Sequence, residues 1–454
     1  MRRSRQLTAI LALVLAGAAA GNRPAVSAQS APVAIDTTIA SAALLSQLPD
    51  GEQKRRFMLD CTGCHQLHGG IAAPGGAPRS EGSWTEAIAR MLGFAGASTG
   101  FPVIAHDRTA GATAAWLVRH LDTGALDRAR AQPRLTQGAA HVTEYPLPAA
   151  GDLPHDLAVD RDGRVVITGM FTHVMYRLDP RSGAMDTIPI PVPTANPRAV
   201  EIAPDGSWWV LLGAPRAIAR FEPDAGRWST TRIGEYPHSI GIDSGGTRVW
   251  FNGHFTRAPE LIGSLTIASG AVDTIHAPAH PELASVPGGP IPYELRVAPN
   301  GTIWLSELQG NRIISYEPVS RRFTAHTLPT TWSGPRRFDI DSSGVLWIPA
   351  YAANLLVRFD PRTGAFREIP LPVADAAPYV ARVDHADGAV WIGTGAGDAV
   401  LRYEPGADQF TTVPLPSRGA LVRHLAVDPR TRDVWVAYGA SPGIAARIAR
   451  IRLR

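Results

Sequence analysis

The sequence predicts an all-β seven-bladed propeller preceded by a small all-α domain. Three observations predict this fold class. One pattern of proline, turn and tryptophan positions recurs along the chain from residue 141 to its end. Each copy has room for four short strands separated by turn residues, as a propeller blade does. The segment before residue 141 instead has helical spacing of its apolar residues.

The amino-terminal residues are typical of a secretory signal. Arg2, Arg3 and Arg5 precede an apolar run of about 14 residues, which is shorter than the roughly 20 needed to cross a bilayer. Small residues at 26–28 then match a signal-peptidase site. We therefore expect residues 1–28 to be a signal peptide, residues 29–46 to be a linker, and the mature protein to be periplasmic or secreted with no membrane span.

Charge and composition exclude several functions. The formal charge of +4 comes from four arginines in the first 28 residues, so the mature chain is neutral. A neutral chain gives no indication of nucleic-acid binding. Lys54 is the single lysine among 44 basic residues. The propeller therefore lacks the lysine that quinone-dependent sugar dehydrogenases place near their cofactor.

Cys61 and Cys64 are the two cysteines of the chain, and they stand in Cys61-Thr62-Gly63-Cys64-His65. This spacing is the attachment signature of c-type haem, in which each thiol adds to one vinyl group and the adjacent histidine ligates the iron. A disulfide, a redox pair and half a zinc site are the alternatives. A zinc site needs further ligands at regular spacing, and a thioredoxin-like motif needs a βαβ context. The motif predicts one covalent haem c held by Cys61, Cys64 and His65.

Residues 47–124 resemble a class I cytochrome c domain. Helices are expected over 50–59, 83–94 and 108–121, the second of them capped by Ser83 with Glu86 three residues later. The resemblance implies electron transfer and a methionine as sixth iron ligand, for which Met91 is the candidate and His106 the rival. Residues 125–140 are expected to be a second linker.

The repeat is clear in its first copy. Pro154-His155-Asp156-Leu157 opens a strand, an Asp-Gly turn follows, and two further strands end at Asp179-Pro180 and Ile190-Pro191. The frame recurs from six later positions, which are Pro197, Pro237, Pro292, Pro335, Pro378 and Val422. The seventh copy lacks a fourth strand, and residues 141–148 match it. We expect that strand to close the ring over residues 141–454 and so to remove exposed sheet edges.

The repeat resembles the virginiamycin B lyase (streptogramin lyase) family, as in the stretch from Asn300-Gly301 through Trp304 to Asn311-Arg312. That family implies a histidine base and a divalent metal held by glutamates. Its Glu-x-His element is missing here, because Leu153 and Tyr236 stand two residues before the two histidines that open a copy. The nearest substitute is His238 with Glu294 and Glu307, which would hold a cation such as Mg²⁺.

The residue after the repeat's proline is polar or aromatic in every copy. A position that faces the channel of a propeller and carries such side chains favours a site for an anionic or hydrogen-bonding ligand. We expect this substrate-binding ring to comprise His155, Arg198, His238, Tyr293, Arg336, Tyr379 and Arg423.

The third copy has two long loops, residues 254–260 and 277–290, that are expected to open on the same face. His254, His276 and His280 lie in or beside them. These histidines are either solvated side chains or ligands of a second metal or haem.

Together these features predict an exported monohaem c-type cytochrome fused to a ligand-binding propeller. Electrons would come from a small-molecule substrate or a redox partner protein at the propeller, and whether the propeller itself is catalytic stays open. The alternative is a metal-dependent streptogramin-type lyase, which breaks a C–O bond by elimination and has the haem domain as an accessory.

Overall fold

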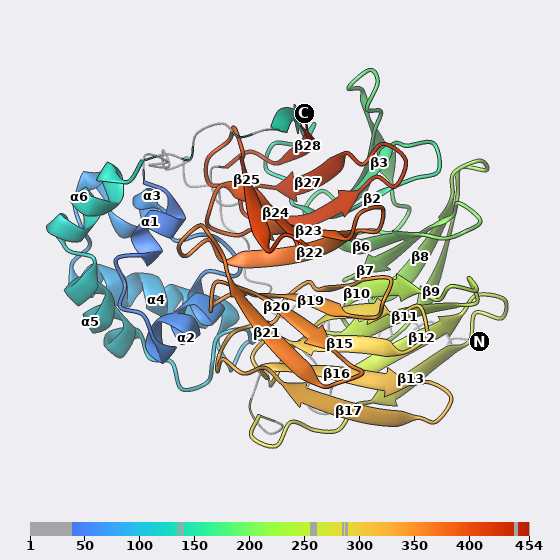
Figure 1. Ribbon diagram of the computed structural model, residues 1–454, viewed down its shortest axis with the longest axis horizontal. Coiled ribbons are helices and arrows are strands. Elements are labelled where there is room, and N and C mark those ends of the chain that lie inside the picture. The colour runs from blue at the N-terminus through green and yellow to red at the C-terminus, as the bar shows by residue number, and fades with distance from the viewer. Residues whose placement is uncertain are drawn as a thin grey trace, which may run out of the picture. The chain divides into compact units, whose positions relative to one another are not determined.

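The computed structural model describes residues 39–133, 135, 138, 140–254, 261–283, 286, 289–439 and 444–453. The predicted signal peptide lies outside these residues. All the described helices and strands belong to one compact unit (Figure 1). In the described part of the chain, no helix is long and apolar enough to cross a membrane.

Helices occupy the described chain before residue 140. They are α1 (Ser41–Leu45), α2 (Glu52–Cys61), α3 (Gly69–Ala72), a 3-10 helix (Pro74–Gly76), α4 (Glu81–Ala95), α5 (Ala110–His120) and α6 (Thr123–Ala131). The three expected helices correspond to α2, α4 and α5. However, Ser80 rather than Ser83 caps α4, since the Ser80 side chain accepts a hydrogen bond from the Ser83 backbone N–H.

Two helices lie where linkers were expected. In residues 29–46, α1 buries Leu44 and Leu45, and in residues 125–140, α6 buries Leu126. Asp122 explains the start of α6, because its side chain accepts a hydrogen bond from the Ala125 backbone N–H. Both segments are too rich in small residues for their apolar spacing to indicate a helix, which is why the linker prediction was wrong there.

The remaining residues form a seven-bladed propeller, as predicted. Blades 1 to 4 are β2 (Pro154–Val159), β3 (Val165–Gly169), β4 (Val174–Leu178) and β5 (Met185–Pro189); β6 (Pro197–Ile202), β7 (Trp208–Leu212), β8 (Ala217–Glu222) and β9 (Arg227–Arg232); β10 (Pro237–Ile242), β11 (Arg248–Gly253), β12 (Leu261–Thr266) and β13 (Val272–His276); and β14 (Pro292–Val297), β15 (Ile303–Glu307), β16 (Arg312–Glu317) and β17 (Arg322–Thr327).

Blades 5 to 7 complete the ring. They are β18 (Asp339–Ile340), β19 (Leu346–Ala350), β20 (Leu355–Asp360) and β21 (Ala365–Pro370); β22 (Pro378–Asp384), β23 (Ala389–Thr394), β24 (Ala399–Glu404) and β25 (Gln409–Pro414); and β26 (Val422–Val427), β27 (Val434–Tyr438) and β28 (Arg447–Leu453) with β1 (Ala140–Pro146). β1 pairs antiparallel with β28 from Ala140 opposite Leu453 to Pro146 opposite Arg447. The predicted closure of the ring is confirmed.

A bulge interrupts the first strand of most blades directly after the repeat's first residue. The pairing register shifts there in blades 1, 2, 3, 4, 6 and 7. Consecutive side chains of a regular strand point to opposite faces, but a bulge sets two residues against one and re-aims them. As a result both His155 and Asp156, and both Arg423 and His424, are buried in contact with other blades. In blades 1 and 7 the first strand thus contributes two adjacent residues to the centre of the ring.

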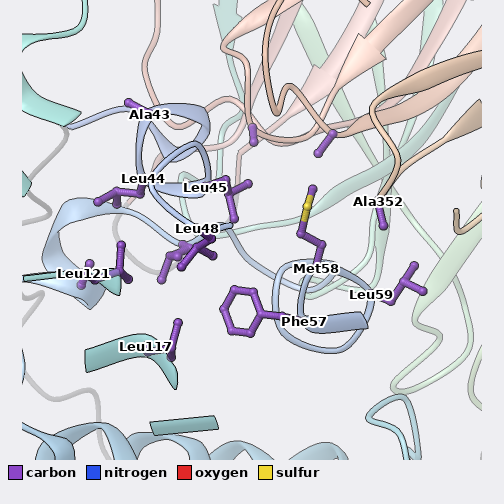
Figure 2. Packing of buried hydrophobic residues seen from close by; sticks show 14 of the residues in the cluster. Ala43, Leu44, Leu45, Leu48, Phe57, Met58, Leu59, Leu117, Leu121 and Ala352 are labelled. Atoms are coloured by element: carbon purple, nitrogen blue, oxygen red, sulfur yellow. The ribbon is translucent and has the colours of Figure 1, made fainter. Parts of the chain in front are cut away.

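The helices and the propeller share one hydrophobic cluster. It joins Leu44, Phe57 and Leu59 of the helices to Tyr351 and Leu421 of the propeller, among others. Figure 2 shows Phe57 and Met58 of α2 in this cluster, together with Ala352 from the β19–β20 turn. The helical segment therefore packs on the propeller through buried apolar surface, which is the main stabilising contribution to such contacts.

Polar contacts reinforce this packing. Lys54 Nζ of α2 is buried and lies 2.7 Å from the Asp375 carboxylate and 2.9 Å from Asp50. Asp375 also accepts a hydrogen bond of 2.7 Å from Ser46 Oγ. The single lysine of the chain is thus an ion-pair partner between the helices and blade 6.

Candidate functional site

A cavity of about 280 Å³ lies between the Cys-x-x-Cys-His loop and the centre of the propeller. Gly63 and Cys64 line it from the loop. All seven residues of the predicted ring line it from the propeller, namely His155, Arg198, His238, Tyr293, Arg336, Tyr379 and Arg423. All seven are buried. The structure therefore brings together two features that the sequence analysis could not place relative to each other.

Three consecutive loop residues contact the propeller directly. Thr62 Oγ1 lies 2.8 Å from the Tyr351 hydroxyl, which also donates a 2.9 Å hydrogen bond to the Thr62 carbonyl. Arg423 Nη2 donates a 2.6 Å hydrogen bond to the Cys64 carbonyl. Gly63, between them, lies against the Arg336 guanidinium. These contacts fix the loop over the channel.

The loop fits the attachment of a c-type haem. Burial raises the pKa of Cys61 to about 12, so its sulfur stays a thiol at neutral pH, and a thiol is the group that adds to a haem vinyl group. His65 Nδ1 lies 3.1 Å from the Gln66 carbonyl. A metal-ligating histidine is commonly held this way, with its other ring nitrogen left for the metal.

The surroundings of the loop include aromatic side chains. Phe94, Phe101 and Phe171 line the cavity. The side chains of Phe94 and Phe171 are 66% and 52% exposed. Exposed aromatic side chains that gather at one place usually mark a binding surface.

The structure does not bring either predicted sixth ligand into the lining of this cavity. Met91 lies on α4 and is 41% exposed, although Trp84 and Ile88 on the same helix are buried. His106 is exposed in the turn before α5. Met170, from the turn after β3, does line the cavity, as Cys64 does. The sequence analysis missed Met170, since nothing in the repeat distinguishes that turn residue.

Three histidines meet at the mouth of the channel. The rings of His238 and His254 stack with centroids 4.2 Å apart, and His155 meets His238 edge-on at 5.4 Å. Nδ1 of His238 lies 2.6 Å from the Tyr293 carbonyl. Burial is the main reason that the pKa of all three is well below the usual value, and nearby arginines add to it. They are therefore neutral imidazoles at neutral pH.

Two tyrosines and two arginines also line the cavity. The hydroxyls of Tyr293 and Tyr379 are hydrogen-bonded to each other. Arg336 donates a 2.8 Å hydrogen bond to Tyr293 and stacks over Tyr351 and Tyr379 at 4.1 and 4.4 Å. Burial opposes ionisation of Tyr379, but Arg336 and Arg423 outweigh it and lower the pKa of that phenol.

The layer below this ring differs in its charges. Arg337 lies 3.3 Å from Asp156 across the channel, and Arg382 lies 3.0 Å from Glu294. His424 Nδ1 lies 2.8 Å from Asp156, and burial lowers the pKa of His424 to about 3. Acids and bases are thus paired here, around a second cavity of about 340 Å³.

His238, Glu294 and Glu307 do not converge, so the expected cation site is not formed as predicted. Arg312 holds both oxygens of Glu307, at 2.6 and 2.7 Å. Glu294 instead pairs with Arg382 in the lower layer. Nowhere in the described chain do three or more His, Cys, Asp or Glu residues form a group that would hold a metal ion.

The histidines of the two long loops also have separate places. His254 lies in the cavity. His276 is exposed at the end of β13. His280 is buried, with Nε2 3.1 Å from the Gly310 carbonyl and Nδ1 accepting from the backbone N–H groups of Glu282 and Leu283. They do not form the second metal or haem site, and most of the first loop, residues 255–260, lies outside the described residues.

Comparisons with known proteins bear on the propeller. No protein-family model and no curated protein matches the chain. Among solved structures, virginiamycin B lyase from Staphylococcus aureus superposes with a TM-score of 0.60 at 20% identity, covering 69% of this chain and 100% of its own. A streptogramin B lyase structure superposes with a TM-score of 0.61 at 18% identity, covering 70% and 100%.

The propeller has the fold of these lyases. A chain of Kuenenia stuttgartiensis hydrazine synthase has the same kind of likeness, with a TM-score of 0.54 at 14% identity over 66% of this chain and 96% of its own. At these identities the comparisons establish the fold alone.

Proposed function

We propose that this chain is a c-type haem protein that exchanges electrons with a ligand bound at the mouth of its propeller. One observation carries this proposal: Cys64 lines the same cavity as all seven channel residues. A ligand that enters this cavity contacts both the channel residues and the loop of residues 61–65, which we call the attachment loop. A small-molecule substrate and a redox partner protein are the two classes of electron donor.

The residues that would hold the haem follow from the motif. Cys61 and Cys64 would bind it covalently, His65 would ligate the iron through Nε2, and Met91 or Met170 would supply a thioether as a further ligand. When bound, the haem supplies one-electron chemistry at a potential set by these ligands and by its burial.

The channel residues have roles that depend on their charges. Arg198, Arg336 and Arg423 orient a negatively charged or oxygen-rich ligand by charge-assisted hydrogen bonds. His238, neutral and held through Nδ1, accepts a proton at Nε2 when the ligand is oxidised. The aromatic side chains of Phe94 and Phe171 limit access of water from the side.

Covalent haem staining on a denaturing gel tests the attachment. The full-length protein, expressed in a host with haem-attachment machinery, should stain, and the Cys61→Ala/Cys64→Ala double variant should not. His141→Gln, on the exposed side of β1, serves as a matched variant that keeps the stain. An unstained parent protein would refute the proposal.

Anaerobic stopped-flow spectroscopy tests the redox role. Reduction of the haem band by candidate donors should slow by roughly 10²- to 10⁴-fold in His238→Gln, the usual effect of removing a positioned base. The rate should be unchanged in His141→Gln. Equal rates in both variants would remove His238 from the reaction.

A second candidate function is elimination at the same cavity, in the manner of a streptogramin lyase. Two observations favour it. The propeller shares the fold of these lyases, and a histidine-to-alanine variant of the Staphylococcus aureus lyase, solved with quinupristin, is described as catalytically inactive. Here the neutral imidazoles of His238 and His254 stand together at the channel mouth.

Incubation with quinupristin, followed by chromatography and mass spectrometry, tests this candidate. Product formation that is lost in His238→Gln would support it, independently of any haem signal. Absence of product at high protein concentration would exclude quinupristin as a substrate and leave the redox proposal standing.

A further inference from the structure

Six arginines are buried in the described part of the chain, and they divide into two groups. Arg312, Arg337 and Arg382 each lie within 3.3 Å of a carboxylate. The other three have no carboxylate partner among the described residues, and they are Arg198, Arg336 and Arg423. This second group is the one that lines the cavity beneath the attachment loop.

The hydrogen bonds of the second group go to neutral groups. Arg198 bonds the Tyr236 hydroxyl at 2.8 Å, and Arg336 bonds that of Tyr293 at 2.8 Å. Arg423 bonds the Cys64 carbonyl at 2.6 Å. In all three arginines the Nε atom is buried without a hydrogen-bond partner. Each guanidinium therefore has donor capacity that the protein does not use.

The rest of the cavity supplies little negative charge. Asp60 is the one acidic residue among the described residues that line it, and Arg108 already holds this carboxylate. The histidines at the channel mouth are neutral. The stacking of Arg336 on Tyr351 and Tyr379 stabilises one cation only in part, since buried charges cost free energy unless they are paired.

We propose that Arg198, Arg336 and Arg423 form a binding site for carboxylate groups at the mouth of the channel. Planar carboxylates match the paired N–H donors of a guanidinium. The proposal deepens the proposed function and rests on it for one of two possible sources of the carboxylates. The carboxylates come either from the propionate groups of the haem or from a carboxylic-acid ligand that diffuses into the cavity.

The layer below shows why this site is selective. There the acids Asp156 and Glu294 already pair with Arg337 and Arg382, so an incoming carboxylate would meet like charge. Only the upper layer presents unpaired cations. A ligand would therefore bind next to Cys64 and would not pass down the channel.

Succinate, a small dicarboxylate, is the probe for the diffusible source. Isothermal titration calorimetry on the full-length protein as purified, at constant ionic strength in sodium chloride, should show binding. Replacing any one of the three arginines by glutamine should raise the dissociation constant at least 10-fold. Arg362→Gln is the control: it removes a charge from a side chain that is 71% exposed, and it should leave the dissociation constant for succinate unchanged.

The propionate source gives a different pattern. The haem-loaded protein then does not bind succinate, whereas the Cys61→Ala/Cys64→Ala variant does. A redox titration of the loaded protein should also show a lower midpoint potential in Arg336→Gln, because loss of a nearby cation disfavours the reduced haem. Whether the haem-loaded protein binds succinate decides the source even where the double variant does not fold.

Failure of this inference differs from failure of the proposed function. If the protein carries no covalent haem, the calorimetry still tests the site. Succinate binding that depends on the three arginines, or a potential lowered by their loss, supports the inference. No succinate binding in either form, with an unchanged potential in all three variants, would overturn it.

Discussion

Gly63 lies so close to the guanidinium of Arg336 that a Cβ at position 63 would collide with Nη2. The guanidinium has little freedom to move away, since it bonds Tyr293 and stacks between tyrosine rings. Glycine is therefore required in the attachment loop by a propeller residue 273 positions later in the chain.

Replacing Gly63 by alanine should destabilise the protein by about 1–3 kcal/mol, the usual cost of an extra methyl group in a packed place. The measurement is urea denaturation followed by circular dichroism. Gly93→Ala is the matched control, because position 93 lies inside α4 with open space around it, and alanine should there add up to about 1 kcal/mol. Equal effects of the two changes would contradict the close approach.

Lys54→Met should cost about 3 kcal/mol, because it leaves the Asp375 carboxylate without its cation at the contact between α2 and blade 6. Asp50→Asn removes the other partner of Lys54. The side chain of Asp50 is 97% exposed. That change should stay within about 0.5 kcal/mol. The same urea denaturation measures both variants. Similar decreases in the free energy of unfolding would mean that the buried Lys54–Asp375 pair contributes no more than the exposed Lys54–Asp50 pair.

The buried histidines make stability depend on pH. The pKa values of His155, His238 and His254 are well below the ordinary value near 6.5, so the unfolded chain binds protons that the folded chain does not. The stability that they contribute is complete above about pH 6.5 and is lost as the pH falls below it.

The free energy of unfolding should therefore decrease by up to about 1.4 kcal/mol per pH unit for each of these histidines between about pH 6.5 and pH 5. Denaturation curves at several pH values measure this slope. His238→Gln should reduce the slope, and His141→Gln, at an exposed position, should not. A slope unaffected by His238→Gln would show that this imidazole binds protons equally in the folded and unfolded chains.

In the haem protein proposed above, the sixth iron ligand is open to a direct test between two methionines. Ferric haem with a methionine ligand has a weak absorption at long wavelength that is lost when the thioether is removed. Met91→Ala should abolish it if α4 moves its exposed side chain onto the haem, and Met170→Ala should abolish it if the propeller provides the ligand. Absence of the band in the parent protein would point to a histidine such as His106.

Much of the fold follows from the sequence because the repeat is regular. The recurring proline, turn and tryptophan positions determine the strands, and the missing last strand predicts the pairing of β1 with β28. The seven ring residues share one position in the repeat, so their convergence follows as well. The sequence pattern does not predict α1 and α6, because the burial of these two helices depends on their contacts with the other helices.

The sequence predicted the candidate site less completely than it predicted the fold. The bulge after the repeat's first residue does not alter the pattern of residue types, so Asp156 and His424 were missed as channel residues. The pairing of Glu307 with Arg312 had a visible signal, because the two residues flank a short turn and lie opposite each other. The contact of residues 62–64 with the propeller had no signal in the sequence, because the propeller residues that they contact are far away along the chain.

The bulged strands have a consequence for how such a protein diversifies. Because neighbouring positions in one strand belong to two separate layers, a substitution at the first position changes the chemistry beneath the attachment loop and leaves the paired charges below intact. The ion pairs that connect blades 1, 4, 5, 6 and 7 and the residues that would meet a ligand are thus carried by different positions of the repeat.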